Sequence, residues 1–307
     1  MMSQAASMTV RPQAPPPAHS LRAIADDILT AGQAAQKRLS GGERRIAIHE
    51  LRVALKRWRA MLRLLEEPIG DETVIMRHVA RLLARELGRS RDAQTVLDAM
   101  ADLAKQKNGG PQPLPARTEA AITRRLQAMR DTSEAEQLPD ELIQSLHDSL
   151  TRMSTRLASW PLEQISLEDI AAAVARSYRR ARRRLPREWD GTDPEEIHDF
   201  RKAVVTLRYQ LYLVAPVWPK MFHTFIGETQ KLRMQLGKSN DLVVLGALTA
   251  PKQPLARWRS HLMPQIERRQ RFHLHRARSL ADRVFAESPR SFHKHLAALA
   301  KAAAKSA

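Results

Sequence analysis

The sequence predicts an all-α protein. Its long segments are dominated by Ala, Leu, Arg, Glu and Gln, which are strong helix formers, and they are separated by breaks that contain proline or glycine. Most segments span roughly 15 to 30 residues, the size of the helices in a bundle. The alternation of polar and apolar residues that marks a half-buried strand is absent, so we expect no sheet.

An internal repeat predicts how these helices are organised. HELRVALKRWRAMLRLL starts at His49 and HDFRKAVVTLRYQLYLV starts at His198, while LGRSRD occupies residues 87–92 and LGKSND residues 236–241. Both pairs of blocks are 149 residues apart. We therefore expect two pseudo-symmetric antiparallel helical bundles, residues 21–158 and 162–307, that together form one domain. Residues 1–20 are rich in proline and are expected to form a disordered tail.

Proline and glycine mark the ends of the expected helices. The breaks fall at residues 41–42, 68–70, 108–115, 139, 161, 186, 191–194, 216–219, 251–254 and 289. The clearest helix start is at Asp193-Pro194, because a capping Asp and a Pro in the first turn are followed by Glu195 and Glu196 at the positive end of the helix dipole.

The first repeated helix carries a basic stripe. At about 100° per residue, alternating spacings of four and three place its members on one face, about 80° wide. They are Arg45, His49, Arg52, Lys56, Arg59 and Arg63. The predicted buried stripe is formed by Leu51, Leu55, Trp58, Leu62 and Leu65. Its counterpart in the second copy is formed by Phe200, Val204, Leu207, Leu211 and Val214.

The second copy keeps only part of this basic stripe. His198, Arg201 and Arg208 remain, and Lys202 adds a charge, but Val205 and Thr206 stand at the positions of Lys56 and Arg57. A further helix carries a cluster of arginines without an acid, and the candidates in it are Arg176, Arg179, Arg180 and Arg183. Arginine suits phosphate because its planar guanidinium binds two oxygens.

Two interpretations of the basic stripes are open. They could be the solvated faces of amphipathic helices. Like charges at this spacing repel, however, and an acid-free stripe is simplest to explain by a bound polyanion. His49 and His198 are either packed or capping histidines, or imidazoles that become protonated when an anion binds. We expect Asp92 and Asp241 to orient arginines, and Gly88 and Gly237 to permit close helix packing or a helix break.

The composition is consistent with a polyanionic partner. Lys and Arg total 51 against 33 Asp and Glu, a formal net charge of +18. The absence of cysteine excludes disulfides and thiolate chemistry. No segment is apolar enough to span a membrane or to act as a signal peptide, so we expect a cytoplasmic protein without a membrane partner.

These motifs closely resemble those of the CHAD family, the conserved histidine α-helical domain. The resemblance rests on a His-x-x-Arg helix with further basic residues, followed by Leu-Gly-x-x-Arg/Asn-Asp, both occurring twice. It implies two helical bundles, binding of inorganic polyphosphate without catalysis or a cofactor, and recruitment to polyphosphate granules. Carried over to this chain, the contact residues are His49, Arg52, Lys56, Arg59, His198, Arg201 and Arg208.

Two other functions are weighed against this one. A nucleic-acid-binding protein would use the same phosphate contacts, but aromatic residues for base stacking total only 5%. A phosphate-transferring or hydrolysing enzyme would use His49 or His198, but the sequence has no P-loop and no acidic metal cluster. The pairs His273/His275 and His293/His295 are expected to be exposed helix histidines rather than metal ligands.

Overall fold

A computed structural model describes residues 21–88, 92–105, 114–135 and 138–306, and within these ranges the regular elements are helices. This confirms the prediction of an all-α protein. The first α-helices are α1 (Leu21–Lys37), α2 (Arg44–Leu64), α3 (Glu66–Ile69), α4 (Asp71–Glu86), α5 (Asp92–Ala104), α6 (Ala116–Ala135) and α7 (Asp140–Ser159). They are followed by α8 (Leu167–Arg182), α9 (Pro194–Val214), α10 (Pro219–Ala247), α11 (Arg259–Val284) and α12 (Pro289–Ser306). Short 3-10 helices lie at Leu162–Gln164, Ala215–Val217 and Ala256–Trp258.

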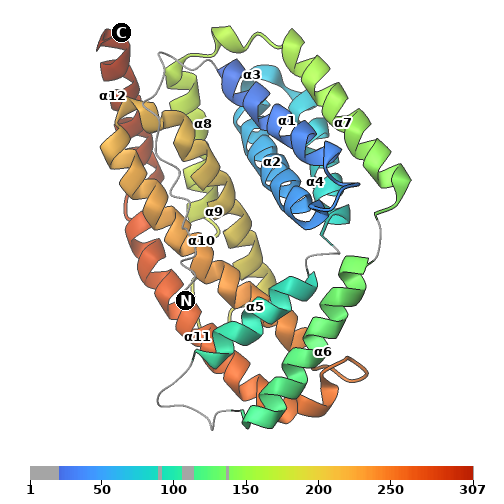
Figure 1. Cartoon of the computed structure of the whole chain (residues 1–307). Coiled ribbons are helices and arrows are strands. Elements are labelled where there is room, and N and C mark those ends of the chain that lie inside the picture. Colours follow the sequence, from blue (N-terminus) through green and yellow to red (C-terminus); the bar gives the residue numbers. More distant parts are fainter. Residues whose placement is uncertain (1–20, 89–91, 106–113, 136–137, 307) are drawn as a thin grey trace, which may run out of the picture.

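The helices form two groups that meet along α2 and α9. In Figure 1, α1, α2, α4 and α7 lie together on one side, and α8 to α12 lie together on the other. The long helices α10 and α11 run side by side, and α5 and α6 lie across their far end. The Gln210 side chain of α9 donates a hydrogen bond from Nε2 to the Ala60 carbonyl of α2, at 2.8 Å. This buried contact fixes the two groups against each other.

Local sequence explains where α8 and α9 begin. Ser166 and Asp169 form a capping box at the start of α8, in which the Asp169 amide donates to Ser166 Oγ at 3.1 Å. Asp193 caps α9 by accepting a hydrogen bond from the Glu195 amide at 2.9 Å, and Pro194 occupies the first turn. The helix start predicted at residues 193–194 is therefore confirmed.

Both predicted apolar stripes are buried. The residues of α2 and α9 that the periodicity assigns to the core are at most 2% exposed, and they belong to one hydrophobic cluster. Trp58 of α2 stacks on Trp160 with ring centroids 6.2 Å apart and ring planes 3° apart. This cluster contains residues from both expected halves, including Leu21 of α1 and Phe292 of α12.

A second hydrophobic cluster joins α5 and α6 to α10 and α11. Its buried members are Val96, Ala99, Met100, Leu103, Ile122, Leu126, Leu242, Leu245, Leu255, Leu262 and Ile266. The helices α5 and α6 precede residue 158, whereas α10 and α11 follow residue 162. Both hydrophobic clusters therefore contain residues from the two stretches of sequence, 21–158 and 162–307.

Candidate functional site

The arginine of the first His-x-x-Arg motif lies between α2 and α4. Arg52 of α2 is half-buried and donates a hydrogen bond from Nη1 to the Ala84 carbonyl near the end of α4, at 3.3 Å. A Cβ atom on Gly88 would lie 3.1 Å from Arg52 Nη1 and 2.9 Å from the Arg85 carbonyl oxygen. Glycine is therefore required here, because a side chain would push the guanidinium and the backbone apart.

The second motif repeats this arrangement on α9 and α10. Arg201 of α9 is half-buried and lies against Gly237, where a Cβ would be 3.6 Å from Nε and 3.7 Å from Nη2. A Cβ at these distances would make an ordinary van der Waals contact, so the packing does not itself require glycine at residue 237. The alternative of a helix break at Gly237 is wrong, because α10 continues through residues 236–241 as an unbroken helix.

The next arginine along each stripe is also half-buried. Burial lowers the pKa of Arg59 in α2, and the positive charges of Arg81 and Arg77 in α4 lower it further. Arg208 of α9 lies over the ring of Tyr209, with its Cζ 4.4 Å from the ring centroid. In both arginines Nε is buried and donates to no acceptor among the described residues. These cations are only partly compensated, so an anion placed beside them would be stabilised.

The remaining candidates on α2 differ in exposure. Arg45 and His49 are exposed, whereas Lys56 and Arg63 are half-buried. Arg63 Nη1 lies 3.7 Å from Glu66 Oε2, and Glu66 also forms an ion pair with Arg77. An acid at the end of α2 therefore balances part of the charge of the stripe there.

On α9, His198 and Lys202 are held by polar neighbours. His198 Nδ1 lies 3.0 Å from Asn240 Oδ1, so a residue of the second LGKSND block orients the imidazole. Burial lowers the pKa of His198, and so do Lys202 and Arg201, whereas Glu195 and the hydrogen bond to Asn240 oppose this shift. Lys202 is exposed and forms ion pairs with Asp199 at 2.9 Å and Glu195 at 3.4 Å.

The arginine cluster after residue 175 is divided between different surroundings. Arg176 of α8 forms an ion pair with Glu67 of α3 at 2.5 Å. Burial lowers the pKa of Arg180, helped by the charges of Arg184 and Arg183. Arg179 and Arg183 are exposed. The prediction that the whole cluster lies in one helix is wrong at its end, because α8 stops at Arg182 and Arg183 follows it.

The structure describes the side chain of only one of the two acids in the Leu-Gly blocks. The side chain of Asp92 lies outside the described residues, and Asp241 is half-buried on α10. The orientation of arginines by these two acids stays a prediction.

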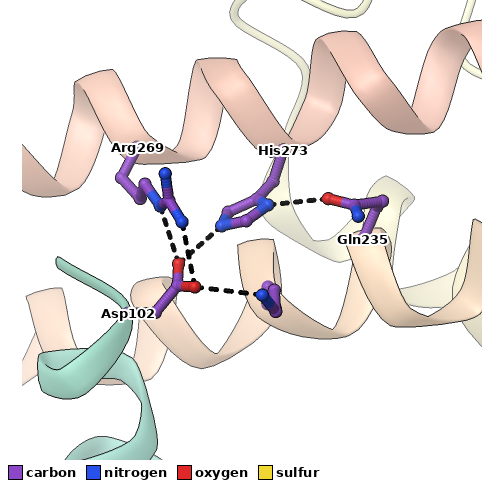
Figure 2. A network of polar contacts seen from close by, with 5 residues as sticks. Asp102, Gln235, Arg269 and His273 are labelled. Atoms are coloured by element: carbon purple, nitrogen blue, oxygen red, sulfur yellow. Dashed lines mark hydrogen bonds and ion pairs between the residues drawn. The ribbon is translucent and has the colours of Figure 1, made fainter. Parts of the chain in front are cut away.

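A buried ionic network that the sequence did not predict joins α5 to α10 and α11 (Figure 2). Asp102 of α5 accepts two hydrogen bonds from Arg269 of α11, at 2.8 and 3.0 Å, and one from Lys238 of α10 at 3.0 Å. His273 Nε2 lies 2.6 Å from the same carboxylate, and its Nδ1 lies 2.7 Å from Gln235 Oε1.

The network corrects the expectation for His273. This histidine is 1% exposed rather than a surface residue, while His275 and His293 are exposed and His295 is half-buried. Its carboxylate partner comes from a helix about 170 residues away, so no local spacing could reveal it. One feature of the sequence could have indicated a buried ionic contact. Asp102 is a charged residue beside the apolar Ala99 and Leu103, on a helix face that is otherwise buried.

Within the described ranges the structure contains no group of three or more His, Asp or Glu side chains that could hold a metal ion. No helix in the same ranges is long and apolar enough to cross a membrane.

The fold and these contacts define an all-helical protein in which two related basic helices, α2 and α9, contact each other. Each of them packs one arginine, Arg52 or Arg201, against a glycine. The family model of the CHAD domain matches residues 23–250, about three quarters of the chain, and the chain belongs to this family. The match begins in α1 and ends just after α10, so α11 and α12 lie outside it.

A solved structure has a similar fold. The fold is similar to the crystal structure of the CHAD domain from the plant Ricinus communis, with a TM-score of 0.55 and 19% sequence identity. The likeness covers 88% of this chain and 92% of the plant chain, and it therefore includes more of the chain than the family model does. No curated protein matches this chain by sequence.

Proposed function

We propose that this CHAD protein binds inorganic polyphosphate without catalysis, through the basic faces of α2, α8 and α9. The proposed contact residues are Arg45, His49, Arg52, Lys56, Arg59, Arg63, Arg176, Arg179, Arg180, Arg183, His198, Arg201, Lys202 and Arg208. The proposal includes two pseudo-symmetric halves, residues 21–158 and 162–307, that each supply part of this surface. It also includes a cytoplasmic protein that is recruited to polyphosphate granules.

The matched positions of four arginines carry this proposal. Arg52 and Arg201 lie against the glycines of the two Leu-Gly blocks, and Arg59 and Arg208 follow seven residues later on the same stripes. All four guanidinium groups belong to half-buried residues on helices that contact each other. Two rows of arginines on adjacent helices suit a chain of phosphates, because each planar guanidinium can bind two oxygens of one phosphate.

Electrostatics supports the same ligand. Burial and the neighbouring Arg81 and Arg77 lower the pKa of Arg59, and this means that its charge is destabilised in the free protein. A polyanion would reverse the local sign of the potential and relieve this repulsion. A single phosphate could compensate only one or two of these groups, so a polymer of phosphate is the better match.

Direct titration with polyphosphate chains of defined length tests the proposal. Arg52→Gln combined with Arg201→Gln should weaken binding at least tenfold. The matched control is Arg124→Gln combined with Arg125→Gln, which removes the same charge from the exposed face of α6. Equal losses in the two double variants would show that binding reflects net charge alone and would overturn the proposed site.

Two further measurements separate the alternatives. Competition between polyphosphate and RNA should leave polyphosphate bound, whereas displacement by an equal concentration of RNA phosphate would favour a nucleic-acid-binding function. Incubation with polyphosphate should release no inorganic phosphate, and steady release that His49→Gln or His198→Gln abolishes would instead indicate an enzyme.

A further inference from the structure

A hollow of about 320 Å³ lies between α1, α2 and α9. Its size falls at the lower end of the range of small-molecule sites. Most of its wall is aliphatic, with Ile24 of α1 and Leu213 of α9 as examples. Two cations, Arg57 and Arg208, line it, and no acidic residue does.

The polar groups of this hollow are incompletely satisfied. Gln210 is 0% exposed and uses Nε2 to hold the Ala60 carbonyl, yet its Oε1 accepts no hydrogen bond from the described residues. Nε of Arg208 is likewise buried and donates to none of them. Buried polar atoms without a partner are costly, so a bound group that supplies both a donor and an acceptor would stabilise the hollow.

An aromatic surface lies beside these polar groups. The guanidinium of Arg208 lies over the Tyr209 ring at 4.4 Å and within 5.8 Å of the centroid of Tyr212. Tyr212 is 47% exposed and lines the hollow. Planar heteroaromatic rings stack on such a guanidinium–tyrosine surface.

We propose that this hollow binds a nucleoside monophosphate, a ligand class distinct from polyphosphate. The base would stack on Tyr212 and the Arg208 guanidinium. Movement of the side chains that cover Gln210 Oε1 would let an N–H or O–H of the nucleoside donate to it, and Arg57 would bind the phosphate. Fully ionised polyphosphate has no hydrogen to donate to Gln210 and no ring for the tyrosines, so the hollow selects against it.

Calorimetric titration of the full chain with AMP and GMP tests this site. At least one of them should bind, with ribose 5-phosphate and adenosine each at least tenfold weaker, because one lacks the ring and the other the phosphate. Tyr212→Ala and Arg57→Gln should each lower nucleotide affinity about tenfold, the range expected for one stacked base or one charged contact. Circular dichroism of both variants verifies that the helices are retained.

Matched controls make the result specific to the hollow. Trp218→Ala removes another exposed aromatic residue, and Arg257→Gln removes an arginine that stacks on Trp258 at 3.8 Å elsewhere. Neither should change nucleotide affinity. Absence of AMP and GMP binding overturns the proposal. So does a loss caused by Arg52→Gln but not by Tyr212→Ala, because it places the nucleotide on the basic stripes.

This site and the polyphosphate site can fail independently. Tyr212→Ala should keep polyphosphate affinity within about threefold, since Tyr212 is uncharged and lies outside the proposed polyphosphate contacts. A protein that binds polyphosphate but no nucleotide refutes only the hollow, and one that binds nucleotide but no polyphosphate refutes only the basic stripes.

Discussion

Replacement of Asp102 by alanine should destabilise the protein far more than its position on a short helix suggests. The carboxylate is 7% exposed and contacts Arg269, which is 13% exposed, and His273, which is 1% exposed. Lys238 is 39% exposed and contributes little by comparison. Because Asp102→Ala leaves the buried Arg269 charge uncompensated, we expect a loss of about 3 to 5 kcal/mol in the free energy of unfolding.

Urea unfolding followed by circular dichroism measures this loss. The matched control is Asp98→Ala, one turn earlier on α5, where the carboxylate is exposed and accepts a hydrogen bond from Gln94 at 2.9 Å. That variant should change the free energy of unfolding by no more than about 0.5 kcal/mol. A loss below about 1 kcal/mol for Asp102→Ala, or equal losses for the two variants, would refute the reasoning.

The pH dependence gives the same prediction a second test. Burial alone would raise the pKa of Asp102, but hydrogen bonds from His273, Arg269 and Lys238 outweigh it and lower the pKa far below its usual range. The stabilisation is therefore complete above the unfolded-state pKa of about 4 and is lost as pH falls below it. The difference between wild type and Asp102→Ala should shrink as pH falls below 4.

Three predictions concern polyphosphate. Its affinity should fall steeply and linearly on a log–log plot against salt, because binding releases counterions; a nearly flat plot would contradict this. Arg59→Gln should weaken binding more than Arg208→Gln, since the second half lacks two basic residues of the first. Titration of both variants tests this order, and equal or reversed losses of affinity would contradict it. Binding should strengthen as pH falls from about 8 to 6, because burial and nearby cations lower the pKa of free His198 and a bound anion would favour its protonation. The double variant His49→Gln/His198→Gln should flatten this profile, and an unchanged profile would make both histidines structural.

Periodicity and local chemistry predicted much of the fold. The apolar stripes of α2 and α9 are buried because a helix positions every third or fourth residue on one side, whatever the partner. The start of α9 was equally readable, since Asp193 caps its own helix. Glycine gave a less definite signal, because Gly237 was compatible with either close packing or a helix break. In the fold, Gly237 is buried inside an unbroken α10, where it lies against Arg201.

The contacts between distant helices could not be predicted in this way. Asp102, Arg269 and His273 come together only because α5 crosses onto α10 and α11, and no spacing in the sequence encodes that crossing. The apolar residues Val96 and Leu103 of α5 pack in the same cluster as Leu262 of α11. The ionic network therefore lies in the same helix contact as these apolar residues, and the internal repeat predicted neither of them.

Several polar and charged side chains of the second copy of the repeat are engaged within the fold. Lys238 of the LGKSND block is paired with Asp102, and Asn240 of the same block holds His198. Lys202 is paired with Asp199 and Glu195. A polyanion approaching these residues must compete with carboxylates that are already in place, and each exchange cancels part of the gain. If the basic stripes bind polyphosphate as proposed, we expect this competition and the missing charges at Val205 and Thr206 both to weaken the second half relative to the first. If neutralising Asp199 and Glu195 by Asn and Gln raises polyphosphate affinity, the ion pairs contribute to the asymmetry; if it does not, the substitutions at 205 and 206 account for it alone.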